Sequence, residues 1–220
     1  MAQAARTPRE RYRDQIRTEV KALAREQIAT AGASALSLNA IAKQMGMSGP
    51  ALYRYFAGRD ELITELISDA YRSLADAFRA AEADGADLPR LARTLRRWAL
   101  DDPQRYFLIY GTPVPGYQAP PDTTAIAAEI MAALLDTCAR QPARPGPGAG
   151  SPLDPHLARH RDWAGDHPAE PAVLRLALLA WTRLHGVLSL ELAGQFNGMG
   201  FDPEVLFEAE LAALTVLPDC

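Results

Sequence analysis

Apolar residues return every three or four positions along most of the chain, which is the spacing of one face of an α-helix. One such series covers residues 16–28 and ends before Gly32, and a second covers 38–45 behind Ser37, a suitable N-cap. No stretch shows the strict alternation of apolar and polar residues that a half-buried strand requires. The pattern therefore predicts an all-α protein.

Further helices are expected where the same spacing continues. These segments are 51–56 after Ser48-Gly49-Pro50, then 62–78, 88–98, 103–110, 126–135, 169–193 and 202–217. Two segments interrupt the pattern. Gly111–Tyr117 holds prolines and glycines that forbid regular structure, and residues 142–152 (PARPGPGAGSP) are expected to form a mobile loop.

Charge is distributed unevenly along the chain. Residues 1–61 carry ten Lys and Arg against six Asp and Glu, a net charge of +4, whereas the whole chain has a net charge of −4. A basic N-terminal part on an acidic body suits a protein that presents one end to a polyanion. We therefore expect two domains, one over residues 1–58 and a larger helical one over 59–220.

Composition argues for a soluble, cytoplasmic protein. Cys138 and Cys220 lie far apart and form neither a disulfide framework nor a metal-ligand spacing, which fits a reducing compartment. The most apolar run, 176–182, is bounded by Arg175 and Arg183 and is too short to span a bilayer. The N-terminus has no apolar core of the kind found in signal peptides. No membrane association is expected.

Enzymatic chemistry is not indicated. The sequence offers no nucleophile paired with a base and no phosphate-binding glycine loop. His156 and His160 have the i, i+4 spacing of two metal ligands, but no third ligand accompanies them, so a solvated histidine pair is the simpler interpretation. We expect no catalytic site, no metal and no cofactor.

The functional signal lies in the two short helices expected within residues 37–56. Gly46-Met47 joins them and Ser48 caps the second one, which is the arrangement of a helix-turn-helix motif. In such a motif the second helix enters the major groove with its N-terminal residues at the base edges. Short helices joined by glycine also occur as ordinary packing elements, so the pattern alone leaves both interpretations open.

The wider string decides between them. Residues 35–63 (ALSLNAIAKQMGMSGPALYRYFAGRDELI) resemble the DNA-binding signature of the TetR family. The matching positions are Ile41-Ala42, Gly46, Met47, Ser48, Leu52-Tyr53, Tyr55-Phe56 and Arg59-Asp60-Glu61-Leu62. A less specific resemblance, to one TetR subgroup, involves Trp181, His185-Gly186 and the GTPVPGY segment. The family resemblance implies a regulator whose N-terminal domain binds operator DNA and whose C-terminal domain dimerises and senses a small molecule.

The resemblance assigns roles to particular residues. Tyr53 matches the family tyrosine whose hydroxyl meets a phosphate, and Arg59 matches its basic backbone clamp. Ser37 and Ser48 stand at helix N-termini, where hydroxyl and backbone N–H groups suit phosphate. The other residues of the expected DNA-binding surface are Asn39, Lys43, Gly49, Pro50, Ala51, Arg54 and Tyr55. Of these, Arg54 can contact a guanine or equally a phosphate, and Tyr55 can be a core residue.

The expected base-reading surface is thin. Gly49-Pro50-Ala51 offers almost no hydrogen bonding to base edges, although Pro50 or Ala51 can touch a thymine methyl. A sequence-independent architectural DNA-binding protein therefore remains an alternative, and the sequence does not distinguish a repressor from an activator. A basic N-terminal arm, expected to enter the minor groove or simply to raise affinity, consists of Arg6, Arg9, Arg11 and Arg13.

Aromatic residues on successive helices of the larger domain are expected to line an effector cavity. The set is Trp98, Tyr106, Phe107, Tyr110, Trp181 and His185. Mostly apolar walls with few polar groups favour a lipophilic or aromatic effector of drug size. A well-packed aromatic core without a cavity is the alternative, and His185 can equally be a core histidine with a partner.

The last two helices are too apolar to face water. Their leucines and phenylalanine are Leu174, Leu178, Leu188 and Leu192 on one helix, and Leu206, Phe207, Leu211 and Leu214 on the other. Paired with their symmetry mates, these helices would form the four-helix interface of a homodimer, unless they pack only within one monomer. A homodimer predicts a palindromic operator, from which a repressor would be released by its effector.

Overall fold

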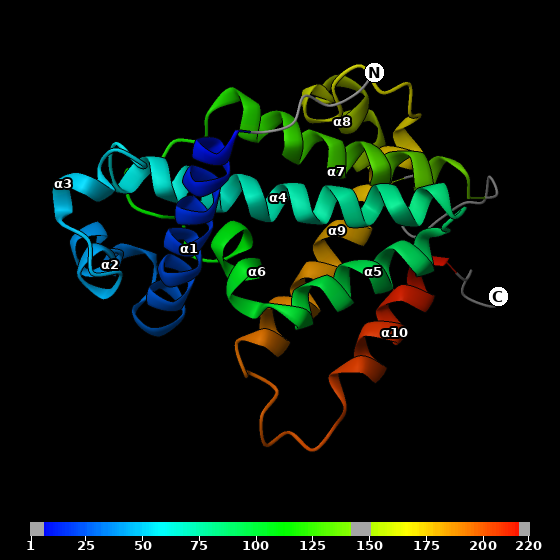
Figure 1. Cartoon of the computed structure of the whole chain (residues 1–220). Coiled ribbons are helices and arrows are strands. Elements are labelled where there is room, and N and C mark those ends of the chain that lie inside the picture. Colours follow the sequence, from blue (N-terminus) through cyan, green and yellow to red (C-terminus); the bar gives the residue numbers. More distant parts are fainter. Residues whose placement is uncertain (1–6, 142–150, 216–220) are drawn as a thin grey trace. The chain divides into compact units, whose positions relative to one another are not determined.

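The computed structural model of the protein describes residues 7–141 and 151–215 (Figure 1). Over these residues the chain is helical and contains no strand, which confirms the predicted all-α class. The elements are α1 (Pro8–Ala31), η1 (Ala33–Ala35), α2 (Leu38–Gln44), α3 (Gly49–Leu52), α4 (Arg59–Ala83), α5 (Leu88–Asp101), α6 (Pro103–Tyr110), α7 (Pro121–Ala139), α8 (Leu153–Arg159), η2 (Asp162–Ala164), α9 (Pro171–Leu192) and α10 (Pro203–Thr215). Residues 142–150 of the loop expected at 142–152 lie outside the described residues.

The chain divides into two compact units. The first comprises the chain up to Ala70 together with Gln104–Thr123, and the second comprises Tyr71–Pro103 and the chain from Thr124 onward. This division differs from the expected boundary after residue 58, because the first turns of α4 and most of α6 belong to the first unit. A boundary placed at Gly58 from its helix-breaking character could not show that the following helix packs back on α1.

The first unit has an apolar core built from helices of several lengths. The buried residues of α1 are Ile16, Val20, Ala24 and Ile28, and those of α2 are Leu38, Ile41 and Ala42. Leu52 of α3, Phe56, and Leu62 and Ile63 of α4 are all 0% exposed. These are the positions that the three- and four-residue spacing predicted, so the apolar pattern sets both the helices and the faces they bury.

An ionic clamp joins α1 to α4 on the side of that core. The α1–α4 clamp consists of Arg17, Lys21 and Arg25 of α1 and Glu61, Glu65 and Asp69 of α4. Lys21 Nζ lies 2.7 Å from Asp69 Oδ2, and a guanidinium nitrogen of Arg25 lies 3.5 Å from the same oxygen. Residues 1–61 have a net charge of +4. Extending the segment to residue 70 adds Glu65 and Asp69, so residues 1–70 hold ten cations against eight acids and have a net charge of +2.

The second unit is arranged around α9. This helix contacts α10, α8 and α5, and it buries Leu174, Arg175, Ala177, Ala180, Leu184, Val187 and Leu188. Alone among the described helices, α9 has the length and apolar composition to cross a membrane. The run at 176–182 is therefore part of a longer apolar helix than the sequence suggested. Its contacts with three neighbouring helices are those of a core helix.

Arginines fasten α9 to its neighbours. Arg96 of α5 is 8% exposed, and its two terminal nitrogens both meet the carboxylate of Glu191 on α9. The Arg96 guanidinium carbon also lies 5.3 Å from the centre of the Phe207 ring of α10. Arg175 of α9, 3% exposed, pairs with Asp154 of α8. Buried charges of this kind persist only when they are paired and hydrogen-bonded.

Candidate nucleic-acid interface and effector cavity

The helix-turn-helix predicted from the sequence is present in the first unit. The Ser37 hydroxyl accepts a hydrogen bond from Ala40 N at 3.3 Å and so caps α2. Gly46 has a φ of +66°, a left-handed conformation that glycine adopts without steric cost, and it turns the chain toward α3. The second helix is shorter than expected. It ends at Leu52 and is followed by a turn over residues 53–55 before the buried Phe56.

Six of the predicted DNA-binding residues are exposed on this motif. They are Asn39 and Lys43 on α2, Ser48 before α3, Pro50 within it, and Tyr53 and Arg54 in the turn after it. Tyr53 is 46% exposed, which is unusual for a large aromatic side chain without a partner surface. Among the described residues, Lys43 and Arg54 have no acidic partner. The motif therefore carries charges that the protein itself does not neutralise.

The other predicted DNA-binding residues are partly occupied within the unit. Ser37, Gly49, Ala51, Tyr55 and Arg59 are half-buried. Arg59 Nη2 donates a hydrogen bond to the Ala33 carbonyl at 2.8 Å, which ties the start of α4 to η1. A guanidinium has five N–H donors, so this bond leaves others for a phosphate. Arg59 therefore has a structural role that the sequence did not reveal.

The N-terminal arm predicted from the basic residues is wrong for three of its four members. Arg9, Arg11 and Arg13 are exposed on the first turns of α1, which begins at Pro8. Thr7 and Glu10 form a capping box, with Thr7 N donating to Glu10 Oε2 at 2.7 Å. The Thr-x-x-Glu spacing is visible in the sequence and would have indicated a helix start. Arg6 lies outside the described residues.

The six aromatic and histidine residues of the expected effector cavity fall into two groups of three. Tyr106, Phe107 and Tyr110 lie on α6 in the first unit, where the Tyr106 and Tyr110 ring centres are 5.3 Å apart. Trp98, Trp181 and His185 lie in the second unit, where the Trp181 and His185 ring centres are 4.1 Å apart. Each group is described within its own unit, and the effector site that joins all six stays a prediction.

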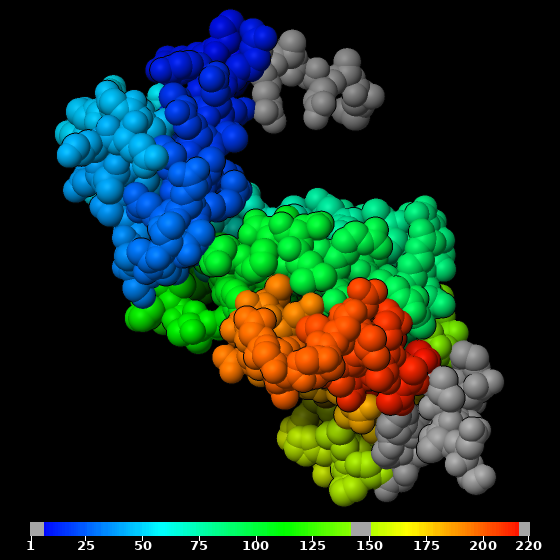
Figure 2. All heavy atoms as spheres, turned by 90° about the horizontal axis from the view of Figure 1, so that it is seen from below, coloured from blue at the N-terminus to red at the C-terminus, as the bar shows by residue number. Residues whose placement is uncertain are grey.

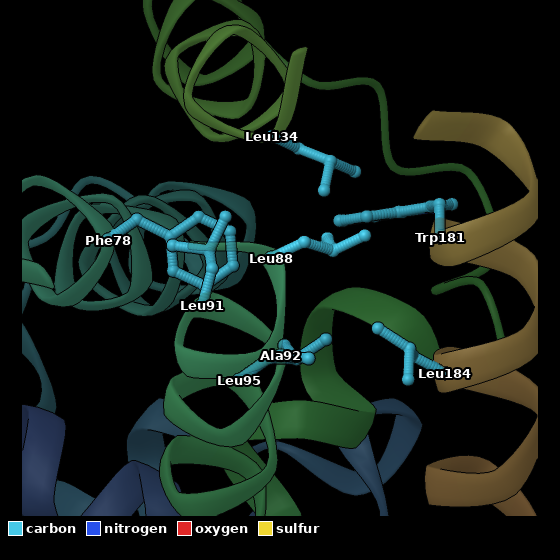
Figure 3. Close-up of a pocket in the computed structure, with 8 residues that line it drawn as sticks. All are labelled: Phe78, Leu88, Leu91, Ala92, Leu95, Leu134, Trp181 and Leu184. Atoms are coloured by element: carbon cyan, nitrogen blue, oxygen red, sulfur yellow. The ribbon is translucent and has the colours of Figure 1, made fainter. Parts of the chain in front are cut away.

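An apolar cavity lies in the core of the second unit (Figure 3). It is lined by Phe78, Leu88, Leu91, Ala92, Leu95, Leu134, Trp181 and Leu184. Figure 3 shows Trp181 reaching from α9 toward Leu88 and Leu134. Its volume of about 10 Å³ suits one water molecule and no larger ligand. Of the six predicted residues, only Trp181 lines it.

The histidine one turn beyond Trp181 is kept neutral. Burial lowers the pKa of His185 to about 4, because the charged imidazolium is poorly solvated there. In the same unit, Trp98 Nε1 donates a hydrogen bond to Ser73 Oγ at 2.9 Å. His156 and His160 stack with ring centres 4.4 Å apart. Within the described part of the chain, no group of three or more His, Cys, Asp or Glu residues is placed to hold a metal ion.

A wider pocket lies within the first unit. It has a volume of about 190 Å³ and is lined by Ile28, Gly32, Ala33, Gln104, Phe107, Leu108, Thr112 and Val114. Phe107 thus belongs to a pocket different from the one that Trp181 lines. Gly111 comes directly before Thr112 of this lining, and a Cβ there would lie 2.4 Å from the Phe107 carbonyl oxygen. Only glycine lets the chain turn back so closely after α6.

Comparison with known proteins agrees with this architecture. The family model described as bacterial regulatory proteins, tetR family, matches residues 22–66, and that of the tetracyclin repressor-like C-terminal domain matches residues 88–214. The HTH-type transcriptional regulators Rv1816 of Mycobacterium tuberculosis and Mb1846 of Mycobacterium bovis are each 37% identical to the chain. Each alignment covers 99% of this chain and 98% of the relative.

Solved structures extend the comparison. The crystal structure of a candidate regulatory protein, SCO4313, is 69% identical with a TM-score of 0.85, covering 94% of this chain and 98% of that one. FadR from Bacillus subtilis, solved in complex with stearoyl-CoA, is 16% identical with a TM-score of 0.53 over 90% of this chain and 97% of its own, and so shares the fold. The chain belongs to the TetR family of transcriptional regulators, which are DNA-binding proteins rather than enzymes.

Proposed function

We propose that the protein is a cytoplasmic repressor that binds a palindromic operator as a homodimer and is released from it by a small lipophilic effector. The observation that carries the DNA-binding part is the contrast between two sets of cations in the first unit. Three cations of α1 (Arg17, Lys21 and Arg25) are held in the α1–α4 clamp, whereas Lys43 and Arg54 on the helix-turn-helix have no acidic partner among the described residues. Cations without an acidic partner, on a motif of a size that fits the major groove, are suited to binding the phosphates of DNA.

Each exposed residue of the motif has a contact that its chemistry supports. The Tyr53 hydroxyl and the Lys43 ammonium are assigned to phosphates, which position the protein without reading sequence. Arg54 is assigned to a guanine edge, with a phosphate as its alternative. Ser37, Ser48 and Arg59 would add backbone contacts at the rim, and Tyr55, whose carbonyl accepts from Arg17, would serve mainly to hold the turn in place.

The dimer is proposed to form through α9 and α10, with only part of the expected residues: Leu178, Leu192 and Leu206 are half-buried and stay in the proposed interface. Leu174, Leu188, Phe207, Leu211 and Leu214 are buried within the second unit, so they belong to the core of the monomer. The exposed apolar residues are Leu190 and Val205, at 47% and 67%, and they are joined by exposed Gly186, Ala209 and Ala212. Figure 2 shows the end of α9, the turn after it and α10 as one exposed face, coloured orange to red. Small residues there allow helices of two subunits to pack closely.

The effector is proposed to bind beside Trp181. The cavity found there is lined only by apolar side chains, and a neutral His185 one turn away supplies a polar group without a charge. Since the cavity holds no more than one water, an effector must select a conformation in which α5, α7 and α9 separate. The FadR of shared fold binds stearoyl-CoA, which supports a lipophilic ligand. The repressor is released from DNA if, in that conformation, the distance between the two DNA-binding motifs of the dimer does not match the operator half-sites.

A sequence-independent architectural role is the second candidate. It is favoured by Gly49-Pro50-Ala51, which places no hydrogen-bonding side chain at the start of α3. The two candidates differ in the ratio of specific to non-specific affinity, which is typically about 10³ or more for a repressor and near one for an architectural protein.

Selection of bound sequences from random duplex DNA tests the proposal. We expect a palindromic consensus with half-sites about one helical turn or more apart, together with a dimeric mass in light scattering at micromolar concentration. A matched pair of variants, Leu190→Asp on the proposed dimer face and Leu100→Asp at an exposed position of α5, should separate dimer disruption from a general effect of charge. No enriched sequence, or an enriched site without dyad symmetry, would contradict the proposal.

Effector release is tested separately with lipophilic compounds. A compound that raises the melting temperature and lowers operator affinity supports it, because a ligand stabilises the conformation that binds it. The controls are His185→Ala, which should weaken the response, and His167→Ala, a histidine of the same unit bonded to Asp136 and not near Trp181 in the chain. If no compound does both, or if both variants respond equally, the Trp181 cavity is not the sensor.

A further inference from the structure

We propose that Asn39 of α2 recognises an adenine base in the major groove. Its side chain lies beside the start of α3, the second helix of the motif, where Gly49 has no side chain. The inference rests on the proposed operator binding and names the residue and the base that give it specificity at one position of each half-site. The base contact is thereby assigned to α2, at the point where the start of α3 has no side chain that could hydrogen-bond to a base.

Gly49 is a glycine for reasons of space rather than backbone conformation. It is not among the glycines with positive φ, so other residues could adopt its conformation. A Cβ added there would lie 3.2 Å from Asn39 Oδ1, closer than most contacts that real Cβ atoms make. The amide of Asn39 therefore lies against the backbone at the start of α3, and the missing side chain makes room for it.

The Asn39 amide is available for a ligand. Asn39 is exposed on α2, and within the described part of the chain its side chain makes no hydrogen bond. The residues it accompanies on α3 are Gly49, Pro50 and Ala51, none of which has a side-chain donor or acceptor. Asn39 thus brings a carboxamide to the start of α3, where residues 49–51 have no hydrogen-bonding side chain of their own.

A carboxamide has one preferred base in the major groove. Its oxygen accepts from the adenine N6 amino group while its nitrogen donates to N7, a bidentate pair that no other base offers in the same arrangement. Lys43, one turn after Asn39 on the same exposed side of α2, is placed for the flanking phosphate. Lys43 would hold α2 on the DNA backbone, and the Asn39 amide would then face the base edge.

The test is the selection of bound sequences with wild type, Asn39→Ala and Asn39→Asp. Wild type should select an adenine at one position per half-site, and Asn39→Ala should lose that preference alone. Replacing the adenine in one half-site should cost wild type about 5- to 100-fold in affinity and cost Asn39→Ala almost nothing. Asn39→Asp keeps the size but has no donor, so the preference should move toward cytosine. Gln44→Ala, which removes another exposed amide of α2, is the matched control.

Gly49→Ala supplies an independent measure. Its methyl group should displace the Asn39 amide by a few tenths of an ångström and weaken discrimination at the same base pair. In the Asn39→Ala/Gly49→Ala double variant the two losses should not add, because both act on one contact. An unchanged consensus with Asn39→Ala, in a variant that melts like wild type, overturns the inference while operator binding stands. If wild type itself selects no sequence, the proposed operator binding fails and the inference fails with it.

Discussion

The two units of the protein treat their cations differently. In the second unit most arginines are paired with acids of other helices, as with Arg72 and Arg79 on Glu129, Arg93 on Glu208 and Arg96 on Glu191. In the first unit the cations divide. Arg17, Lys21 and Arg25 of α1 are paired in the α1–α4 clamp, and Lys43 on α2 and Arg54 in the turn after α3 are left open.

This contrast shows what a charge count can and cannot tell. The +4 charge of residues 1–61 suggested a basic head, yet three of its ten cations are paired with acids of α4. A lysine such as Lys21 and a lysine such as Lys43 look alike in the sequence. They differ in whether an acid from a distant part of the chain reaches them, and only the unpaired one can neutralise a phosphate.

Breaking a buried pair of the second unit should have the largest effect. Arg96→Ala leaves the Glu191 carboxylate, whose side chain is 15% exposed, without its guanidinium. We expect the free energy of unfolding in urea to fall by about 3–5 kcal/mol, the usual cost of an uncompensated buried charge. The control is Arg93→Ala, whose pair with Glu208 has side chains 52% and 37% exposed and should contribute at most about 1 kcal/mol. Equal losses would show that burial does not separate the two pairs.

Acid should act on a histidine that burial keeps neutral in the second unit. Burial lowers the pKa of His185 from 6.5 to about 4 in the folded protein. Between these values the unfolded chain binds a proton that the folded chain does not, so stability falls as the pH falls through this window. The expected loss is about 1.4 kcal/mol per pH unit and about 3 kcal/mol in total.

His185→Phe isolates this contribution, because it keeps an aromatic ring beside Trp181. Urea unfolding of both proteins between pH 7 and pH 4 should give curves that diverge as the pH falls, with the wild type losing more. The pKa values of Glu129 and Glu208 are lowered by their arginines, so their protonation in acid also reduces the stability of the fold. This loss occurs in both proteins and cancels in the difference between their curves. Parallel curves would mean that His185 titrates alike in the folded and unfolded chain.

Local signals predicted the helices well. Apolar spacing placed the buried faces of α1 and α2, and Ser37 and Gly46 marked the start and the end of α2 as the structure has them. Local signals failed where tertiary contacts decide. The second helix of the motif stops at Leu52 because the chain must turn to bury Phe56, and the sequence between them reads as continuous helix.

The site was predicted in its residue types and less well in its geometry. Exposed Tyr53 and Arg54 follow from the family resemblance, but the Arg59 bond to the Ala33 carbonyl joins residues 26 apart and has no local signal. The expected effector cavity shows the same limit, because of its six residues only Trp181 lines the apolar cavity of the second unit. Tyr106 and Trp181 share a chemistry, not a unit, and residue type alone cannot assign side chains to a cavity.

Removing an open cation should affect DNA binding and leave stability unchanged. Lys43→Ala should make the dependence of log affinity on log salt shallower by about two per dimer, one phosphate contact in each subunit. Arg54→Ala should instead relax the preference for guanine at one base pair of each half-site. Lys21→Ala, from the α1–α4 clamp, is the matched control and should lower the melting temperature without changing that slope. A slope that responds to Lys21→Ala as it does to Lys43→Ala would remove the distinction between paired and open cations.

The smallest effect is expected from a contact without charge. Tyr53→Phe removes one hydroxyl from a side chain that is 46% exposed, and the ring remains. Losing a hydrogen bond to phosphate at such a site should weaken operator binding by about 5- to 10-fold, corresponding to about 1–1.5 kcal/mol. The salt slope should stay as in the wild type, because no counterion is released by a neutral group. Tyr12→Phe on α1, where the side chain is 59% exposed, is the matched control and should bind as the wild type does. A loss of affinity in both variants, or a changed slope with Tyr53→Phe, would place the phosphate contact elsewhere on the motif.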